Sequence, residues 1–133
     1  MTKISIPSQE PKIDYDSGVL LLGSCFVENI AKKLEYFKFL NRLNPFGILF
    51  HPAAIHNFLK KVGQNALFDE QDIFLHNGLW HSFEAHSDLN TTQKEQILEK
   101  LNSAVSETHD YIKKASHIIL TPGTAWGYRL NST

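Results

Sequence analysis

The most reactive side chain in the sequence belongs to its single cysteine, Cys25. It stands two residues after Gly23, where an apolar run over residues 19–22 gives way to a helix-like segment that begins near Phe26. A parallel strand that ends in Gly23-Ser24-Cys25 directs its last side chains to the carboxyl edge of a sheet, where open α/β folds bind their ligands. The unpaired amides of a following helix favour a thiolate over a thiol. The pattern therefore predicts a nucleophile, and the alternative is a buried cysteine that behaves as a small hydrophobe.

The sequence also contains seven histidines, which could hold a metal ion if their spacing allowed it. His76, His81 and His86 recur every five residues. That spacing puts neighbours on opposite faces of a strand and well over a quarter-turn apart on a helix. A zinc-binding helix needs separations of three or four residues. We therefore expect histidines in solvated or hydrogen-bonded loops, with no metal site and no cofactor.

Short apolar runs that end at glycine or proline predict the strands that position these residues. We expect strands over residues 18–22, 37–43 and 117–120. The first is fully apolar, as strands of a parallel sheet are. The second precedes Asn44-Pro45, and the third closes on Pro122-Gly123, two signals that end a strand. The glycines at the strand ends are expected at one edge of a parallel sheet.

Helical periodicity predicts the elements between these strands. We expect helices over residues 26–34, 52–62 and 92–115. Pro52 suits the first turn of the second helix, and Gly63 is its expected stop. Thr91 or Thr92 is expected to cap the third helix, and Thr92 forms an expected capping box with Glu95 three residues on. Residues 72–83 include the turn signal Asn77-Gly78 and predict a short hairpin or an irregular insertion that covers the site. Strand, helix and strand in this order form a βαβ unit.

Length and charge limit the class of protein. A chain of 133 residues, 42% of them hydrophobic, can bury one core and is too short for two ordinary domains, so we expect a single domain. Thirteen basic and fourteen acidic residues leave a net charge of -1 without a basic block, which argues against a nucleic-acid or membrane partner. Pro7 stands where a secretory signal would have a continuous apolar region, so no secretory signal is expected. We therefore expect a cytoplasmic location. The oligomeric state stays open.

Three stretches carry a resemblance to a known family. GSCFVENI at residues 23–30 resembles the signature of the GSCFA family, a bacterial group related to the SGNH or GDSL-type hydrolases, with Val27 in place of the family's alanine. NPFGIL at residues 44–49 and LTPGTAW at residues 120–126 are similar to two further parts of that family. The resemblance implies a flavodoxin-like, SGNH-type three-layer α/β fold with a parallel sheet. It leaves the substrate open.

The resemblance also implies roles for particular residues. Cys25 falls on the position of the nucleophile, and Ser24 on the position of the aspartate that precedes it. Gly47 resembles the glycine whose backbone N–H donates to an oxyanion, and the alternative is a turn glycine chosen for its conformation. Ala125 stands where the related enzymes have an asparagine donor, for which Thr124 or a backbone amide could substitute.

A general base is the part that the sequence supplies least clearly. The related hydrolases carry their catalytic histidine near the carboxyl end of the domain, and the resemblance implies the same layout here. Three predicted strands are fewer than a doubly wound sheet usually has, so we expect an amino-terminal portion that lacks this histidine. His86, followed by Ser87 as in a similar pair of the family, is expected to line the pocket or replace the base. The alternative is a structural hydrogen bond in a loop.

These patterns predict one site at the carboxyl edge of the strands. Its expected residues are Ser24, Cys25, Asn44, Gly47, His86, Gly123 and Thr124. The implied activity is hydrolysis or transfer of an acyl group on a small-molecule or glycan-linked ester, through Cys25 or Ser24 as nucleophile. The alternative is a non-catalytic ligand-binding domain of the same fold, which the absence of a side-chain donor at Ala125 favours.

Overall fold

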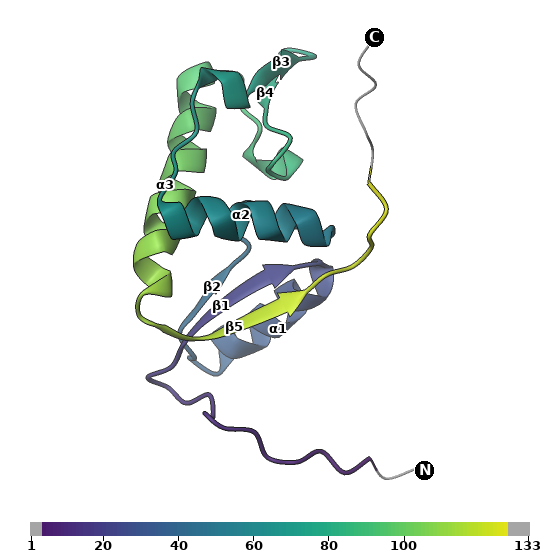
Figure 1. Cartoon of the computed structure of the whole chain (residues 1–133), viewed down its shortest axis with the longest axis vertical. Helices are drawn as coiled ribbons and strands as arrows, with labels where there is room; N and C mark the ends of the chain where they lie inside the picture. The colour runs from purple at the N-terminus through teal and green to yellow at the C-terminus, as the bar shows by residue number, and fades with distance from the viewer. Residues whose placement is uncertain (1–3, 128–133) are drawn as a thin grey trace.

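A three-stranded parallel sheet forms the centre of the computed structural model, which describes residues 4–127 (Figure 1). Its strands are β1 (Gly18–Gly23), β2 (Asn41–Leu43) and β5 (Ala115–Thr121), in the order β2-β1-β5. β1 pairs with β5 along its whole length and with β2 over three residues. The mixed α/β class with a parallel sheet is confirmed.

Helices cover both faces of this sheet (Figure 1). α1 (Cys25–Tyr36) lies on one face, and α2 (Pro52–Gln64) and α3 (Lys94–Ile112) lie on the other. The chain between α2 and α3 holds the 3-10 turns η1 (Glu70–Asp72) and η2 (Ser87–Leu89) and a hairpin of β3 (Phe74–His76) and β4 (Leu79–His81). The hairpin turns at Asn77 and Gly78, as predicted, and both have positive φ. Within residues 4–127, no helix combines the length and the apolar character that a membrane span requires.

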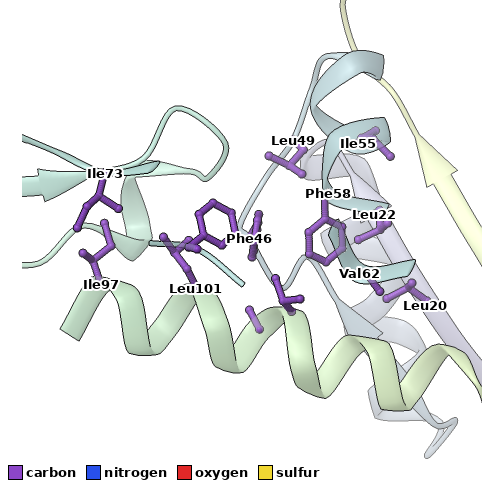
Figure 2. Close-up of a cluster of buried hydrophobic side chains, with 13 residues drawn as sticks. Leu20, Leu22, Phe46, Leu49, Ile55, Phe58, Val62, Ile73, Ile97 and Leu101 are labelled. Carbon is purple, nitrogen blue, oxygen red and sulfur yellow. The ribbon is translucent and has the colours of Figure 1, made fainter. Parts of the chain in front are cut away.

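β1 is buried on both faces because each face packs against a different core. Leu20 and Leu22 contribute to the larger core, together with α2 and α3 (Figure 2). The smaller core lies against α1 and is formed by Val19, Leu21, Val27 and Ala31. This two-sided burial explains why β1 is a continuous apolar run rather than an alternating one.

Phe46 ties the segment after β2 to the larger core. Its side chain is fully buried, and its ring centroid lies 4.5 Å from that of Phe58 on α2 and 5.4 Å from that of Phe68. In the view of Figure 2, Phe46 lies between Leu101 and Phe58. Because close-packed cores tolerate little displacement, this anchor fixes the path of residues 44–51 at the edge of the sheet.

The second strand is shorter than the sequence predicts. α1 continues to Tyr36, and only residues 41–43 of the predicted strand over 37–43 pair with β1. The backbone N–H groups of Phe37, Lys38 and Phe39 donate to carbonyls of the last turn of α1. Helix C-termini leave such carbonyls without intrahelical partners. The residues after α1 therefore complete the helix end instead of the sheet.

The boundaries of α3 also differ from the prediction. The helix begins at Lys94 after Gln93, which forms no side-chain cap, so the expected capping box of Thr92 and Glu95 is wrong. Thr91 is held elsewhere: its backbone pairs with Trp80 of β4, and its hydroxyl donates to the Gln93 carbonyl at 2.7 Å. α3 ends at Ile112 rather than near residue 115, since Ala115 already belongs to β5.

Candidate functional site

The carboxyl ends of β1, β2 and β5 meet at one edge of the sheet, as predicted (Figure 1). The Gly23 N–H donates to Asn44 Oδ1 at 2.9 Å, and the Gly23 carbonyl accepts from Leu49 N–H at 3.1 Å. The Ser24 N–H donates to the Thr121 carbonyl at 2.9 Å. Hydrogen bonds thus link the end of β1 both to the segment after β2 and to the end of β5.

Gly23 is a glycine because the backbone of β5 passes too close for a side chain. Its φ is +139°, and a Cβ built there would lie 2.3 Å from the Thr121 carbonyl oxygen. Residues that carry a side chain rarely adopt this φ, and no Cβ can approach a backbone oxygen so closely. The glycine therefore permits the contact that brings Ser24 beside Thr121.

Gly123 joins the same edge from the segment after β5. Its N–H donates to the Phe50 carbonyl at 2.9 Å, and a Cβ built at Gly123 would lie 2.9 Å from Phe50 Cδ1. These contacts place Gly23 and Gly123 at the same edge of the sheet, as predicted. Because the Gly123 N–H already donates to Phe50, it is not free to bind a ligand. Gly123 instead holds the segment after β5 against Phe50.

Cys25 is the first residue of α1, and its side chain is exposed. The alternative of a buried cysteine is therefore wrong. Ser24 is the N-cap but makes no side-chain cap, and its hydroxyl instead lies 3.4 Å from Thr121 Oγ1. The backbone N–H groups of Cys25 and Phe26 have no hydrogen-bond acceptor among residues 4–127. Two unpaired amides at a helix start create a local positive potential next to the thiol.

Gly47 lies in a turn in which its backbone N–H forms a hydrogen bond. The Gly47 N–H donates to the Asn44 carbonyl at 2.8 Å, and its φ of +75° is one that glycine adopts easily. A Cβ built there would lie 2.5 Å from His86 Cβ. The structure thus supports the turn glycine, and the expected oxyanion donor is not free in this conformation.

Asn44 and Thr124 have structural partners of their own. Asn44 has a positive φ, and its side-chain oxygen holds the Gly23 N–H, while its Nδ2 is buried without a partner among the described residues. Thr124 Oγ1 accepts from the Trp126 N–H at 3.2 Å. Asn44 therefore holds the end of β1 next to Ser24, whereas Thr124 stabilises the exposed segment after β5.

His86 packs against the Gly47 turn rather than against the thiol. Its N–H donates to the Phe46 carbonyl at 2.8 Å, and its Nδ1 accepts from the Asp88 N–H at 3.3 Å. No hydrogen bond joins His86 to Cys25 within the described part of the chain. His86 corresponds to the structural alternative of the two that the sequence left open.

A family model, described as the GSCFA family, matches residues 18–133. The chain belongs to the GSCFA family. Comparison with curated proteins and with solved structures finds no match. In this GSCFA chain, the glycine, serine and cysteine of the signature are Gly23, Ser24 and Cys25, which form the junction of β1 and α1. The signature therefore lies where the unpaired amides and the exposed thiol meet.

The sequence did not reveal Thr121 as a site residue. It ends β5, and its carbonyl and hydroxyl oxygens both accept from the Ser24 N–H, at 2.9 Å and 3.2 Å. Its sequence signal is its place in the LTPGTAW stretch, two residues before Gly123 and directly after the apolar run of the strand. This edge of the sheet thus brings together Ser24, Cys25, Asn44, Thr121 and Gly123, which form the candidate site.

The sequence also did not reveal a hollow at the start of α2. Its volume is about 480 Å³, and it is lined by His51, Ala54, Asn57, Phe83, Glu84, Ala125 and Gly127. His51 is the N-cap of α2: its Nδ1 accepts from the Ala53 N–H at 3.0 Å, and its Nε2 lies 2.8 Å from the Ala125 carbonyl. A neutral imidazole with its proton on Nε2 satisfies both contacts. His51 thereby ties the segment after β5 to α2.

Glu84 is the titratable group of this hollow whose environment changes its acidity. Burial raises the pKa of the Glu84 carboxyl above its ordinary value, Lys61 nearby opposes the rise, and Asp72 adds to it. Its Oε2 is buried without a hydrogen-bond partner among the described residues. Burial without a partner disfavours the charged form.

Replacing Glu84 by glutamine is expected to stabilise the protein at neutral pH and to have no such effect at acidic pH. The pKa is higher in the folded state, so the native protein loses stability as pH rises from the ordinary glutamate pKa through the raised one, and glutamine does not titrate. The gain is at most about 1 kcal/mol because solvent screens a half-buried carboxyl. Urea unfolding at acidic and neutral pH measures it, with Glu99→Gln as the exposed control. An equal gain at both pH values would contradict the burial effect.

Metal binding has no support in the described residues. Within residues 4–127, no group of three or more His, Cys, Asp or Glu side chains is arranged to hold a metal ion. His76 and His81 contact each other through the hairpin, where His81 Nε2 lies 3.2 Å from the His76 carbonyl and His81 Nδ1 lies 2.8 Å from Asn90 Nδ2. These contacts therefore stabilise the hairpin and connect it to the neighbouring loop.

Proposed function

We propose that this GSCFA chain carries the nucleophile of a hydrolase or transferase that acts on an acyl ester of a small molecule or a glycan. The observation that carries the proposal is the exposed Cys25 thiol at the first residue of α1, beside two unpaired amides. This is the edge of a parallel sheet at which open α/β folds bind ligands. The exposed thiol is accessible to a substrate, and the two unpaired amides are hydrogen-bond donors available to a reacting carbonyl.

The proposed reaction begins with the Cys25 thiolate, whose proton has passed to solvent. The sulfur attacks the ester carbonyl carbon, a C–S bond forms, and the carbonyl electron pair moves to oxygen. Collapse of this intermediate breaks the ester C–O bond, and the alcohol leaves with a proton from water. Water then attacks the thioester, releases the carboxylic acid and restores the thiol. An acceptor alcohol in place of water gives acyl transfer.

The oxyanion donors in this proposal are the backbone N–H groups of Cys25 and Phe26. They are the unpaired amides of the α1 start, whereas the N–H groups of Gly47 and Gly123 already donate to carbonyls. Ala125 offers no side-chain donor. Because one such donor is worth on the order of 3 kcal/mol, a site with amides alone is expected to be slow.

Deacylation is expected to be the slower step. No side chain within residues 4–127 hydrogen-bonds to Cys25 Sγ, so the described part of the chain shows no base held against the thiol. Proton transfer by a placed base contributes about 100-fold to 10,000-fold. The thioester should therefore accumulate.

The experiment that tests the proposal is a burst assay with p-nitrophenyl acetate. Rapid acylation followed by slow deacylation should release about one equivalent of p-nitrophenolate per chain and then nearly stop. The released amount is measured by absorbance over time at several protein concentrations. A slope without a burst, equal to that of buffer with an unrelated protein, would contradict the proposal.

A non-catalytic ligand-binding domain is the second candidate function. The specific observation in its favour is that the Gly47 and Gly123 amides are engaged and that Ala125 replaces a side-chain donor. In this case the α1 start would hold a carboxylate or another anion without reacting with it. Such a domain would bind acetate in a way that depends on the α1 start but would release no nitrophenolate above background.

A further inference from the structure

A groove runs along the exposed side of α2. The hollow at the start of α2, of about 480 Å³, adjoins a second hollow of about 300 Å³, and both are lined by Asn57 and Glu84. The second hollow is lined in addition by Lys60, Lys61, Gln64 and Ala66. Residues 51, 54, 57, 60, 61 and 64 recur at helical spacing, so they form one stripe of α2. The two hollows together suit an extended ligand rather than a compact one.

Polar groups that face this groove have unmet hydrogen-bonding capacity. The only such atom of the groove that is buried within residues 4–127 is Glu84 Oε2, which has no hydrogen-bond partner there, whereas the Asn57 amide is exposed and makes no hydrogen bond to the described residues. Lys61 does not neutralise Glu84 by contact, because its Nζ lies 3.8 Å from Asp72 Oδ2 and 4.0 Å from the Phe68 ring centroid. A buried carboxylate oxygen without a partner is costly, and a ligand that donates hydrogen bonds relieves the cost.

Phe83 supplies an apolar plate next to these polar groups. It is 72% exposed, and it lines the hollow at the start of α2. Its ring stacks on Phe74 of β3, with centroids 4.2 Å apart and planes 24° apart, so its orientation is fixed. Exposed and pre-oriented aromatic rings offer contact area at a small cost in conformational entropy.

We propose that the groove along α2 binds a neutral linear oligosaccharide. The C–H face of a sugar ring packs on Phe83, its hydroxyls donate to Glu84, and the Asn57 amide both donates and accepts. Lys60 and Lys61 in the second hollow disfavour a cationic ligand, and Glu84 disfavours an anionic one. The proposal concerns binding alone, so it goes beyond the chemistry proposed for Cys25 and does not depend on it.

Isothermal titration with cellotetraose, chitotetraose and mannotetraose tests this site. At least one of these neutral tetrasaccharides should bind, and Phe83→Ala should weaken its affinity by about fivefold, which corresponds to roughly 1 kcal/mol for one stacking contact. Asn57→Ala should weaken it similarly, and Phe83→Tyr, which keeps the ring, should retain it. Tyr36→Ala, on the opposite face of the sheet and 77% exposed, is the matched control and should change nothing. Far-UV circular dichroism verifies that each variant is folded.

Several results would overturn the proposal. Binding of none of the three tetrasaccharides at millimolar concentration would do so, as would binding that Phe83→Ala and Asn57→Ala leave unchanged. Binding of spermidine or of a neutral tetrapeptide in preference to all three sugars would assign the groove to another class of ligand. Because the titration needs no reaction, Cys25→Ala should bind as the parent chain does, which separates failure of this proposal from failure of the proposed hydrolase.

Discussion

Replacing Cys25 by alanine is expected to abolish the release of nitrophenolate in the burst assay. The thiol is the group that forms the C–S bond, and the chain contains no second cysteine to take its place. Cys25→Ser should retain at most a trace, because a serine hydroxyl keeps the position but is a weak nucleophile without a placed base. The effect should be a loss of the whole burst, measured as equivalents of nitrophenolate per chain.

Ser24→Ala is the matched control for this result. Ser24 is adjacent to Cys25, and its hydroxyl lies 3.4 Å from Thr121 Oγ1, so it is the other hydroxyl or thiol at the start of α1. The variant should keep the burst, since its backbone N–H still donates to Thr121. Loss of the burst in Ser24→Ala together with its survival in Cys25→Ala would move the nucleophile to Ser24. A burst of equal size in the parent chain, Cys25→Ala and Ser24→Ala would mean that neither residue reacts.

Gly23→Ala is expected to destabilise the fold strongly and to disrupt the site with it. Its Cβ would lie 2.3 Å from the Thr121 carbonyl oxygen, and its φ of +139° is strained for alanine. Separating β1 from β5 at this point would also break the hydrogen bonds between Ser24 and Thr121. Strain and overpacking together should lower the free energy of unfolding by roughly 3 kcal/mol or more, as measured by urea unfolding.

Gly63→Ala is the same substitution at another glycine, and it is expected to raise the free energy of unfolding rather than to lower it. Gly63 lies in the last turn of α2, and no atom lies within 4 Å of a Cβ built there. Alanine loses less conformational entropy than glycine when it enters a helix, so this variant should be more stable by about 0.5 kcal/mol. If both variants were destabilised alike, the close approach of β1 and β5 at Gly23 would not be the cause.

Local patterns in the sequence predicted the main elements of the fold. The continuous apolar run of β1 marks a strand that is buried on both faces, and Pro52 marks the start of α2. Asn77-Gly78 marks the hairpin turn. These signals are local because each depends on one residue's backbone preference or on the periodicity of one segment. The placement of Cys25 beyond the end of β1 could be predicted for the same reason.

Contacts between distant segments could not be predicted in this way. Ser24 and Thr121 are 97 positions apart, and neither residue type signals that they will be hydrogen-bonded. Thr91 looked like a helix cap but pairs with Trp80 instead, so a tertiary contact overrides its local preference. Gly47 could be a turn residue or an oxyanion donor until its N–H was located on Asn44. Glu84 became a candidate ligand-binding group only when the fold placed it beside α2.

The proposed reaction requires the thiol at the start of α1 to form a covalent bond with an acyl group. The most direct test is peptide mapping by mass spectrometry after a brief incubation with p-nitrophenyl acetate and acid quenching. We expect one acetyl group, on the peptide that contains Cys25, and hydroxylamine should remove it as it does from a thioester. Acetyl groups on lysines alone, with the Cys25 peptide unmodified, would contradict it.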